Sequence, residues 1–152
     1  MEDKVKILKE ITQELFNLMG VQVTLEVFHD KENEAFVVNV DAGEATGLLI
    51  GRKGETLTSI QTILGIMLKT KTDDWVRVLV NVGNYREKEE EYLKNLAQTS
   101  AARAKETGQP QMLYNLNSHQ RRVIHMYLSE DSSVKTESQG EGNDRYLVVT
   151  PA

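Results

Sequence analysis

Two cations between two glycines are the first group of residues in this sequence that could do chemistry. The segment reads Gly51-Arg52-Lys53-Gly54. Glycine permits a tight turn and lets another chain come close to the backbone. A helix that is expected to begin near Glu55 would point free N–H groups, with about half a positive charge, at whatever docks there. Because Arg52 and Lys53 add ionic contacts, the segment predicts a cradle for phosphate groups.

The second group is an arginine and a histidine four residues apart, Arg121 and His125. Residues at this spacing share one face of a helix, and an exposed pair of this kind can hold a phosphate. The histidine adds a positive charge only when its imidazole is protonated. Arg122 lies on an adjoining face. Three apolar residues are expected on the buried side: Val123, Met126 and Tyr127.

Other kinds of site are disfavoured by the residues present. Gly47, Gly51 and Gly54 have the spacing of neither a Walker loop nor a dinucleotide fingerprint. The chain has no cysteine, which removes disulfides, cysteine nucleophiles and thiolate metal ligands. His119 and His125 are six residues apart and point in different directions on a helix. We therefore expect no metal site and no cofactor.

The charge of the chain is unevenly distributed. Its formal net charge is −5, which alone argues against a nucleic-acid-binding protein. Residues 45–72, however, hold four basic residues and one acid, a local charge of +3, and residues 111–128 hold two arginines and no acid. The acids gather at 30–34, 87–91 and 130–144. Two cationic segments in an acidic chain favour two specific anion sites over indiscriminate electrostatic binding.

The elements around the first group follow from hydrophobic periodicity. Apolar residues at helical spacing between Val5 and Met19 predict a helix that Gly20 ends. Alternation over 21–28 and the apolar run 36–40 predict a β-hairpin. Helices are expected over 44–50 and from residue 55 onward, and a valine-rich strand over 75–81. Gly65 lies inside the second of these helices, where a close packing contact would explain it.

A turn at Val82-Gly83-Asn84 predicts a boundary between domains of residues 1–83 and 84–152. The second domain is expected to begin with a helix over 85–107, which Gly108 and Pro110 end. A short strand at 112–113 and a helix that Asn117 or Ser118 caps and that runs to about residue 128 follow. Strands over 134–138 and 146–150 complete the domain.

Helical and strand phasing also assigns inward positions. Leu48, Ile63 and Tyr92 fall on the apolar stripes of their predicted helices. The chain has five tyrosines, which could stack on bases. Their phasing favours core or half-buried packing for most of them. These tyrosines are Tyr85, Tyr92, Tyr114, Tyr127 and Tyr146.

The segment from Gly47 to Leu57 closely resembles the core of a KH domain, and the predicted element order resembles its type II version. In KH domains this loop clamps the backbone of about four nucleotides of a single strand. The resemblance implies that Gly51, Arg52, Lys53 and Gly54 hold the sugar–phosphate backbone of RNA. The apolar residues at 48–50 are expected to be core rather than base contacts.

The segment from Asn117 to His125 resembles the signature of the domain named for Arg-x-x-x-His, the R-three-H domain, which is associated with single-stranded nucleic acid. Arg121 and His125 match this signature, and the resemblance implies that they contact nucleic acid with Arg122 and Arg145 beside them. The predicted fold class is α+β. It has two small domains, a type II KH domain (α-β-β-α-α-β) followed by an α/β sandwich-like domain that binds single-stranded nucleic acid.

The ordered pair of domains resembles the bacterial Jag (SpoIIIJ-associated protein) family over nearly the whole chain. Family members are implicated in RNA binding, cell shape, cell-wall synthesis and sporulation. The resemblance implies a cytoplasmic, non-enzymatic protein that binds single-stranded RNA as a post-transcriptional regulator or RNA chaperone. Single-stranded DNA is a second ligand class, and a homodimer or a partner KH protein are the protein partners to consider.

No membrane insertion is expected, because no apolar run approaches the roughly 18 residues of a membrane-spanning helix. Many Jag members carry an additional N-terminal domain and linker that this sequence lacks, which puts a membrane- or division-associated role in doubt.

Two other function classes stay open from the sequence. His125 could act as a general acid or base in a phosphodiesterase, although no second catalytic group accompanies it. Either domain could instead serve protein interaction or dimerisation without contacting nucleic acid, which the acidic net charge would suit.

Overall fold

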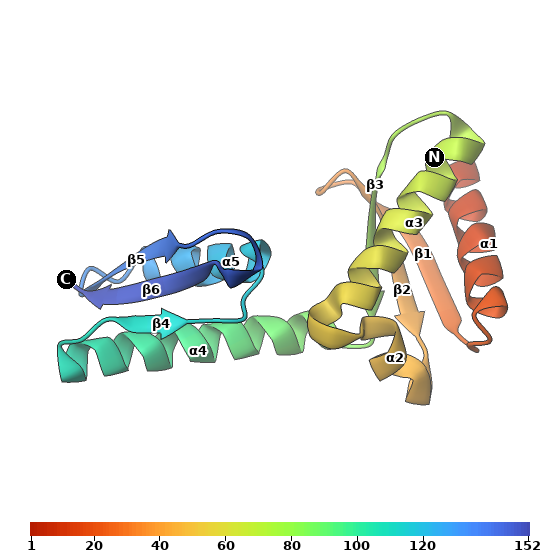
Figure 1. The fold of residues 1–152 in the computed structure, drawn as a ribbon. Coiled ribbons are helices and arrows are strands. Elements are labelled where there is room, and N and C mark those ends of the chain that lie inside the picture. The colour runs from red at the N-terminus through yellow and green to blue at the C-terminus, as the bar shows by residue number, and fades with distance from the viewer. The chain divides into compact units, whose positions relative to one another are not determined.

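The computed structural model describes residues 1–152, which form two compact units, Met1–Arg86 and Glu87–Ala152. The first unit holds three helices and three strands (Figure 1). They are α1 (Glu2–Leu18), β1 (Thr24–Asp30), β2 (Ala35–Asp41), α2 (Thr46–Ile50), α3 (Glu55–Thr72) and β3 (Arg77–Val82). A 3₁₀ turn, Arg52–Gly54, joins α2 to α3. The predicted α-β-β-α-α-β order is confirmed.

The sheet of the first unit has the order β1-β2-β3. β1 and β2 form the antiparallel hairpin, whereas β3 runs parallel to β2, with Phe36 opposite Val78 and Val40 opposite Val82. A parallel pair needs a crossover connection, and α2 and α3 provide it. Residues of α1 and α3 share one core with a single face of this sheet, which fixes the start of α3 relative to the strands.

The strand β1 begins later than predicted, because the end of α1 extends further along the chain. Gly20 has φ +74°, its amide donates to the Asn17 carbonyl at 3.1 Å, and the Val21 amide donates to the Phe16 carbonyl at 3.0 Å. This is a Schellman motif, in which the residue after the glycine closes the helix. Val21 is therefore used for the helix end, and β1 begins at Thr24, three residues later than the alternation predicted.

Three packing predictions in the first unit are wrong. Leu48 is 65% exposed. The helix α2 has only five residues, and of the two leucines predicted to face inward only Leu49 is buried. Ile63 is 44% exposed at the edge of the α3 stripe. A Cβ added at Gly65 would meet nothing within 4 Å, so no close packing contact explains this glycine.

The second unit packs two helices on one face of an antiparallel sheet of order β4-β6-β5 (Figure 1). Leu147 and Val149 of the central strand share one core with Leu93 and Ala97 of the long helix and Ile124 of the other. This arrangement confirms the α+β class. The elements are α4 (Tyr85–Thr107), whose first two residues belong to the first unit, β4 (Gln111–Leu113), α5 (Ser118–Leu128), β5 (Val134–Gln139) and β6 (Tyr146–Pro151).

The inward side of α5 was predicted wrongly. Of the three residues predicted to face inward, Val123 is half-buried against the core, but Met126 and Tyr127 are 61% and 38% exposed. Ile124 and Leu128 are buried instead. An eleven-residue helix lying on a sheet buries one stripe with i, i+4 spacing, and that stripe here starts at Gln120. Tyr92 of α4, also expected inward, is 58% exposed. No helix in the chain combines the length and apolar character needed to cross a membrane.

Candidate nucleic-acid interface

The turn between α2 and α3 has a backbone that side chains rarely allow. Gly51 has φ +70° and ψ −173°, Lys53 has φ +54°, and Gly54 has φ +75°. The Gly51 amide donates to the Gly47 carbonyl at 3.0 Å, which ends α2. The chain then reverses within three residues and enters α3 at Glu55. The two glycines therefore fix where the backbone of the turn lies.

Both glycines also leave room for neighbouring side chains. A Cβ at Gly51 would lie 2.1 Å from the Thr56 hydroxyl oxygen, and a Cβ at Gly54 would lie 2.8 Å from the hydroxyl oxygen of Tyr85. All of these residues belong to the first unit. Thr56 and Tyr85 thus pack against the inner side of the turn, and Arg52 and Lys53 are exposed on its outer side.

Arg52 and Lys53 are exposed, and neither takes part in any of the salt bridges of the chain. Gly54 is the N-cap of α3, and no side chain caps the first amides of this helix. Helix N-termini carry partial positive charge and bind anions readily. Two unpaired cations beside an uncapped helix start can hold phosphate oxygens, with Glu55 as the one acid adjoining the turn in the sequence.

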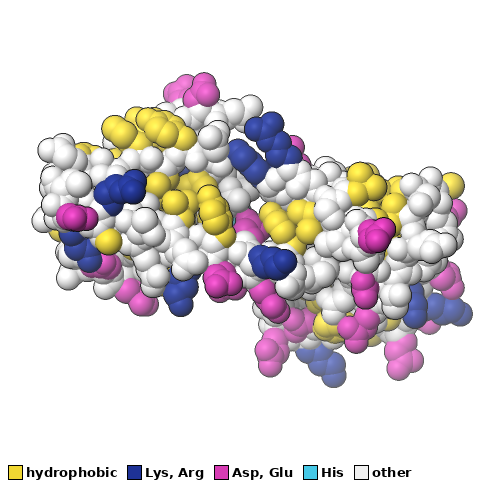
Figure 2. All heavy atoms as spheres, turned by 90° about the horizontal axis from the view of Figure 1, so that it is seen from below, with side chains coloured by type: hydrophobic (Ala, Val, Ile, Leu, Met, Phe, Trp, Pro, Cys, Tyr) yellow, Lys and Arg dark blue, Asp and Glu magenta, His cyan; other side chains and the backbone are white.

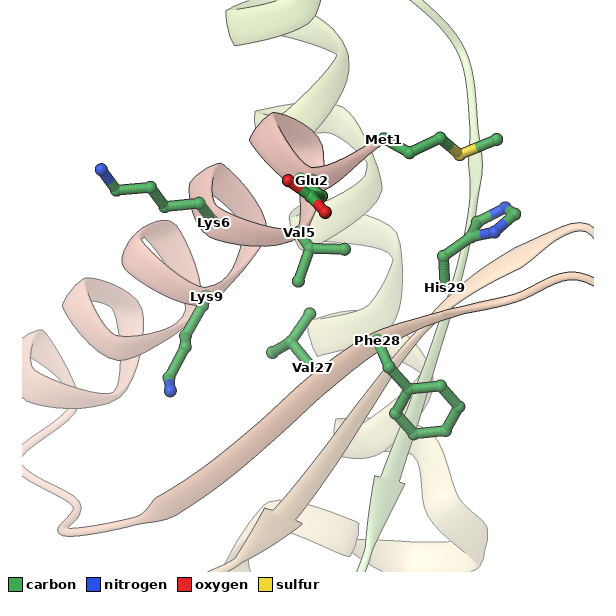
Figure 3. Close-up of a pocket in the computed structure, with 8 residues that line it drawn as sticks. All are labelled: Met1, Glu2, Val5, Lys6, Lys9, Val27, Phe28 and His29. Atoms are coloured by element: carbon green, nitrogen blue, oxygen red, sulfur yellow. The ribbon is translucent and has the colours of Figure 1, made fainter.

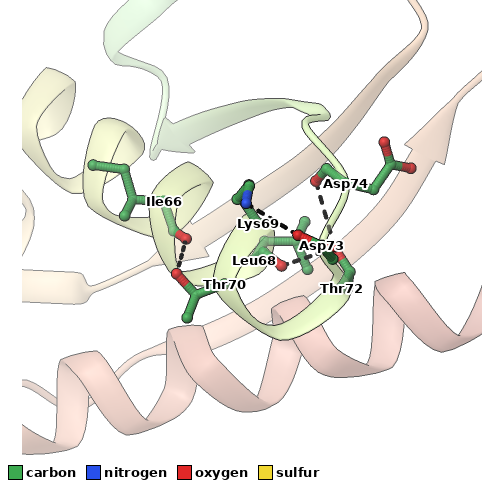
Figure 4. Close-up of polar contacts among 7 residues, drawn as sticks. All are labelled: Ile66, Leu68, Lys69, Thr70, Thr72, Asp73 and Asp74. Carbon is green, nitrogen blue, oxygen red and sulfur yellow. Dashed lines mark hydrogen bonds and ion pairs between the residues drawn. The ribbon is translucent and has the colours of Figure 1, made fainter.

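The cationic segment 45–72 does not form one patch. Lys69 forms an ion pair with Asp73 at 3.1 Å, at the other end of α3, where Thr70 and Thr72 hydroxyls donate to carbonyls one turn earlier (Figure 4). A helix of this length places its two ends roughly 25 Å apart. On the face drawn in Figure 2, Lys and Arg side chains occur in small separate groups among acids. The local charge at the turn therefore comes from Arg52 and Lys53.

The start of α5 is held by a capping box. The Asn117 side chain accepts a hydrogen bond from the Gln120 amide at 2.8 Å, and the Gln120 side chain accepts one from the Asn117 amide at 2.9 Å. Asn117 rather than Ser118 is thus the cap. Buried Gln120 also donates to Glu89 of α4 at 3.2 Å. Gln120 was not among the predicted site residues, although its spacing from Asn117 is that of a capping box.

Arg121 is half-buried, not part of an exposed pair as expected. Its Nη1 donates to the Leu116 carbonyl at 2.6 Å and to the Arg145 carbonyl at 3.4 Å. Both acceptors are backbone groups in loops next to α5, and a guanidinium is suited to join two carbonyls because it carries five N–H donors. Arg121 therefore ties the start of α5 to the start of β6.

The other predicted residues of the second unit lie around this tie. His125 is exposed, and its Nδ1 is hydrogen-bonded to the hydroxyl of Thr136 in β5, a residue that the sequence did not indicate. Arg145 is exposed and donates to the Gly140 carbonyl at 2.9 Å. Arg122 is exposed and takes part in no hydrogen bond or salt bridge. The structure thus brings Arg121 to Arg145, whereas His125 is anchored separately on β5.

A groove of about 480 Å³ lies away from these residues, between α1 and the edge strand β1 (Figure 3). None of the residues predicted to bind nucleic acid lines it. It is lined by Met1, Glu2, Val5, Lys6, Lys9, Val27, Phe28 and His29.

A type II KH unit followed by a smaller α+β unit with an Arg-x-x-x-His helix defines a class of two-domain proteins. The KhpA/KhpB KH-domain family model matches residues 5–80, and the R-three-H domain model matches residues 91–151. The chain belongs to the KhpA/KhpB family, with an R-three-H domain after its KH domain, which confirms the predicted resemblance to the Jag family.

Several relatives are named RNA-binding protein KhpB. The protein from Clostridium symbiosum is 32% identical over 141 residues, which cover 93% of this chain and 63% of the relative. The protein from Bacillus subtilis (strain 168) is 36% identical over 110 residues, 71% of this chain and 53% of the relative. The protein from Lactiplantibacillus plantarum is 32% identical over 131 residues, 86% of this chain and 40% of the relative. The chain thus spans about half the length of these relatives.

Proposed function

We propose that this protein binds single-stranded RNA, with the backbone of the strand held at the turn Gly51–Gly54. The observation that carries the proposal is the pair of exposed, unpaired cations, Arg52 and Lys53, beside the uncapped start of α3. Gly51 is half-buried and Gly54 is buried on the inner side of the turn, so the two cations form its exposed part. KH loops clamp single strands with a turn of this kind. The name that these relatives share, RNA-binding protein KhpB, supports the same function.

The second unit supplies a second contact surface in this proposal. Arg122 and His125 of α5 and Arg145 before β6 are exposed there, and Arg121 ties the start of α5 to the segment that carries Arg145. Two contact surfaces on one chain raise the overall affinity through effective concentration, without any new contact. No catalytic step is proposed. Turnover of RNA by the purified protein, lost in His125→Ala, would instead support a phosphodiesterase.

The test compares two double variants with the same change in charge. Arg52→Asp with Lys53→Asp reverses the charge of the turn. The control, Lys31→Asp with Lys71→Asp, reverses two exposed lysines in the β1–β2 turn and at the far end of α3. Binding of a labelled, unstructured single-stranded RNA is measured by fluorescence anisotropy over a range of salt concentrations.

We expect the variant of the turn to lose affinity and the control to retain most of it. Each phosphate contact to a single strand contributes about 0.7 to the slope of log K against log salt, so the loss of two contacts lowers the slope by about 1.4. An affinity and a slope equal to those of the control would show that the turn does not hold the RNA.

The finer roles belong to the same proposal. A post-transcriptional regulator or RNA chaperone in the cytoplasm would bind many transcripts, so crosslinking in cells followed by sequencing of the bound RNA identifies its targets. Matched RNA and DNA strands distinguish the ligand class, because only RNA offers 2′-hydroxyl groups. Sedimentation at several concentrations tests the homodimer, and capture with a KH-domain protein tests the heterodimer.

A protein-interaction module without RNA binding is the alternative that the net charge of −5 favours. If the wild-type protein retains no single-stranded RNA even at low salt, this alternative replaces the proposal.

A further inference from the structure

The sheet of the second unit has an outer face that the helices do not cover. Leu147 and Val149 of β6 point into the core, so the alternate residues Tyr146 and Val148 point to the opposite side. Met112 of β4 lies directly opposite Val148 on this outer face and is 53% exposed. No helix packs on this face, but Val148 is only 8% exposed and Tyr146 is half-buried, so the exposed part of the apolar strip is Met112 together with the tyrosine next to β4.

Two tyrosines meet at one end of this strip. Tyr114, one residue beyond β4, lies with its ring centroid 5.0 Å from that of Tyr146, at an interplanar angle of 42°. Tyr114 is 59% exposed, and its hydroxyl forms no hydrogen bond. The Tyr146 hydroxyl donates to the Gln139 side chain at 3.2 Å, which holds the second ring against β5. One ring is thus fixed and the other is open to a ligand.

We propose that the Tyr114–Tyr146 pair is a stacking surface for unpaired bases of the single-stranded RNA. The proposal deepens the proposed function and rests on it. Aromatic side chains on an uncovered sheet are a common way to bind single strands, because every base has a flat face that can stack. The phasing of the sequence favours core or half-buried positions for most of the five tyrosines, but three of them are exposed, Tyr92, Tyr114 and Tyr127.

The charges around the pair favour nucleic acid over an apolar peptide. Arg145 directly precedes Tyr146 and is exposed, and the guanidinium of Arg121 reaches the Arg145 carbonyl at 3.4 Å. A strand whose bases stack on the rings can thus place phosphates near two arginines. Along β5, the outward residues are all polar, with Lys135, Glu137 and Gln139 in succession, so the strip does not continue as an apolar docking face. The nearby acids are Glu137, which lies opposite Val148 on the same face, and Glu141 and Asp144 of the neighbouring turn.

Arg121 is the positioning residue for this surface. One of its carbonyl partners, Leu116, lies two residues after Tyr114, and the other, Arg145, directly precedes Tyr146. The guanidinium therefore joins the two chain segments that carry the rings. This arrangement explains why the arginine of the Arg-x-x-x-His helix is half-buried while the histidine is exposed.

The experiment separates stacking from phosphate contacts. Two labelled probes of equal length are used, an unstructured single-stranded RNA and an abasic strand with the same sugar–phosphate backbone. Binding is compared for wild type, Tyr114→Ala, Tyr114→Phe and the control Tyr92→Ala. Tyr92 is equally exposed, at 58%, but lies on α4 and has no ring partner. Thermal unfolding of each variant checks that it folds.

Tyr114→Ala should bind the base-bearing RNA at least about fivefold more weakly than wild type, because base–aromatic stacking contributes measurably at each base. Tyr114→Phe and Tyr92→Ala should bind like wild type, and Tyr114→Ala should match wild type on the abasic strand. An equal loss on both probes, or no loss on either, would overturn the stacking surface while leaving RNA binding intact. A wild-type protein that binds neither probe would overturn both proposals.

A second measurement needs no variant. The ring-proton NMR signals of Tyr114 and Tyr146 in the wild-type protein should move on addition of the base-bearing RNA and stay in place with the abasic strand. Ring signals that stay in place while RNA binds would contradict the proposal.

Discussion

The hydroxyl oxygen of Tyr85 lies 2.8 Å from the point that a Cβ at Gly54 would occupy. Tyr85 is the first residue of α4, and its side chain packs against the core of the first unit. The turn that carries Arg52 and Lys53 is therefore closed from behind by a residue 31 positions later in the chain. A larger residue at position 54 would disturb this contact as well as the left-handed backbone.

Alanine should destabilise the protein far more at Gly51 or Gly54 than at Gly47, which lies four residues before Gly51. Gly51 has a conformation that only glycine adopts readily, so Gly51→Ala should lower the free energy of unfolding by about 1–3 kcal/mol, with a further cost from the Thr56 contact. A Cβ at Gly47 would meet nothing within 4 Å, and the backbone of Gly47 is not in the left-handed region. Urea unfolding of Gly51→Ala, Gly54→Ala and Gly47→Ala checks this, and equal stability of the three would contradict it.

Gly65→Ala should stabilise the protein. Gly65 lies inside α3, where alanine is favoured over glycine by about 1 kcal/mol and a Cβ would meet nothing within 4 Å. Gly20→Ala is the matched control, because its Cβ also meets open space but its φ is +74°. Thermal unfolding should show a higher midpoint for Gly65→Ala and a lower one for Gly20→Ala. A lower midpoint for both would indicate an undetected packing role for Gly65.

Arg121 and Arg122 should differ in their effect on stability despite being neighbours. Arg121→Met removes the bonds to the Leu116 and Arg145 carbonyls, and a lost hydrogen bond to a charged group costs about 1.5–3 kcal/mol. Arg122→Met removes an exposed side chain without such bonds, so it should change stability by less than about 0.5 kcal/mol. Hydrogen exchange of the amides in α5 and β6 measures the difference. Equal protection in both variants would show that the tie does not stabilise the unit.

Asp131 should make the second unit sensitive to acid. The Ser133 hydroxyl and amide and the ammonium of Lys105 lower the pKa of this carboxyl group to about 2. A folded-state pKa below the unfolded value means that the contribution is complete above about pH 4 and is lost as the pH falls from about 4 towards 2. The difference in thermal midpoint between wild type and Asp131→Asn should therefore shrink over this range. A difference that stays constant down to pH 2 would contradict the assignment.

Local patterns were enough to predict most of the fold. Residues close together in the sequence determine where α4 begins and ends and how Gly20 and Asn117 end or start their helices. They also determine the order of strands and helices. Packing was predicted less well, because it depends on which neighbour an element meets. Leu48 and Met126 fall on predicted apolar stripes but face solvent, since α2 and α5 are short and each buries only a narrow stripe of residues.

The candidate site was predicted in its residue types and not in its contacts. The glycines and cations of the turn are contiguous, so their spacing indicates them directly. The partners of Arg121 are carbonyl groups at Leu116 and Arg145, and any residue type provides a carbonyl. The Tyr114–Tyr146 contact arises only when β4 and β6 pair, and the His125–Thr136 hydrogen bond arises only when α5 packs beside β5.

The most direct test of the account is a titration of the isotope-labelled protein with single-stranded RNA, followed through its backbone amide NMR signals. The account predicts that the largest early changes fall on the amides of residues 51–55, and that Arg52→Asp with Lys53→Asp abolishes them. RNA that binds with unchanged affinity while these amides stay in place would contradict the claim that the Gly51–Gly54 turn holds the strand.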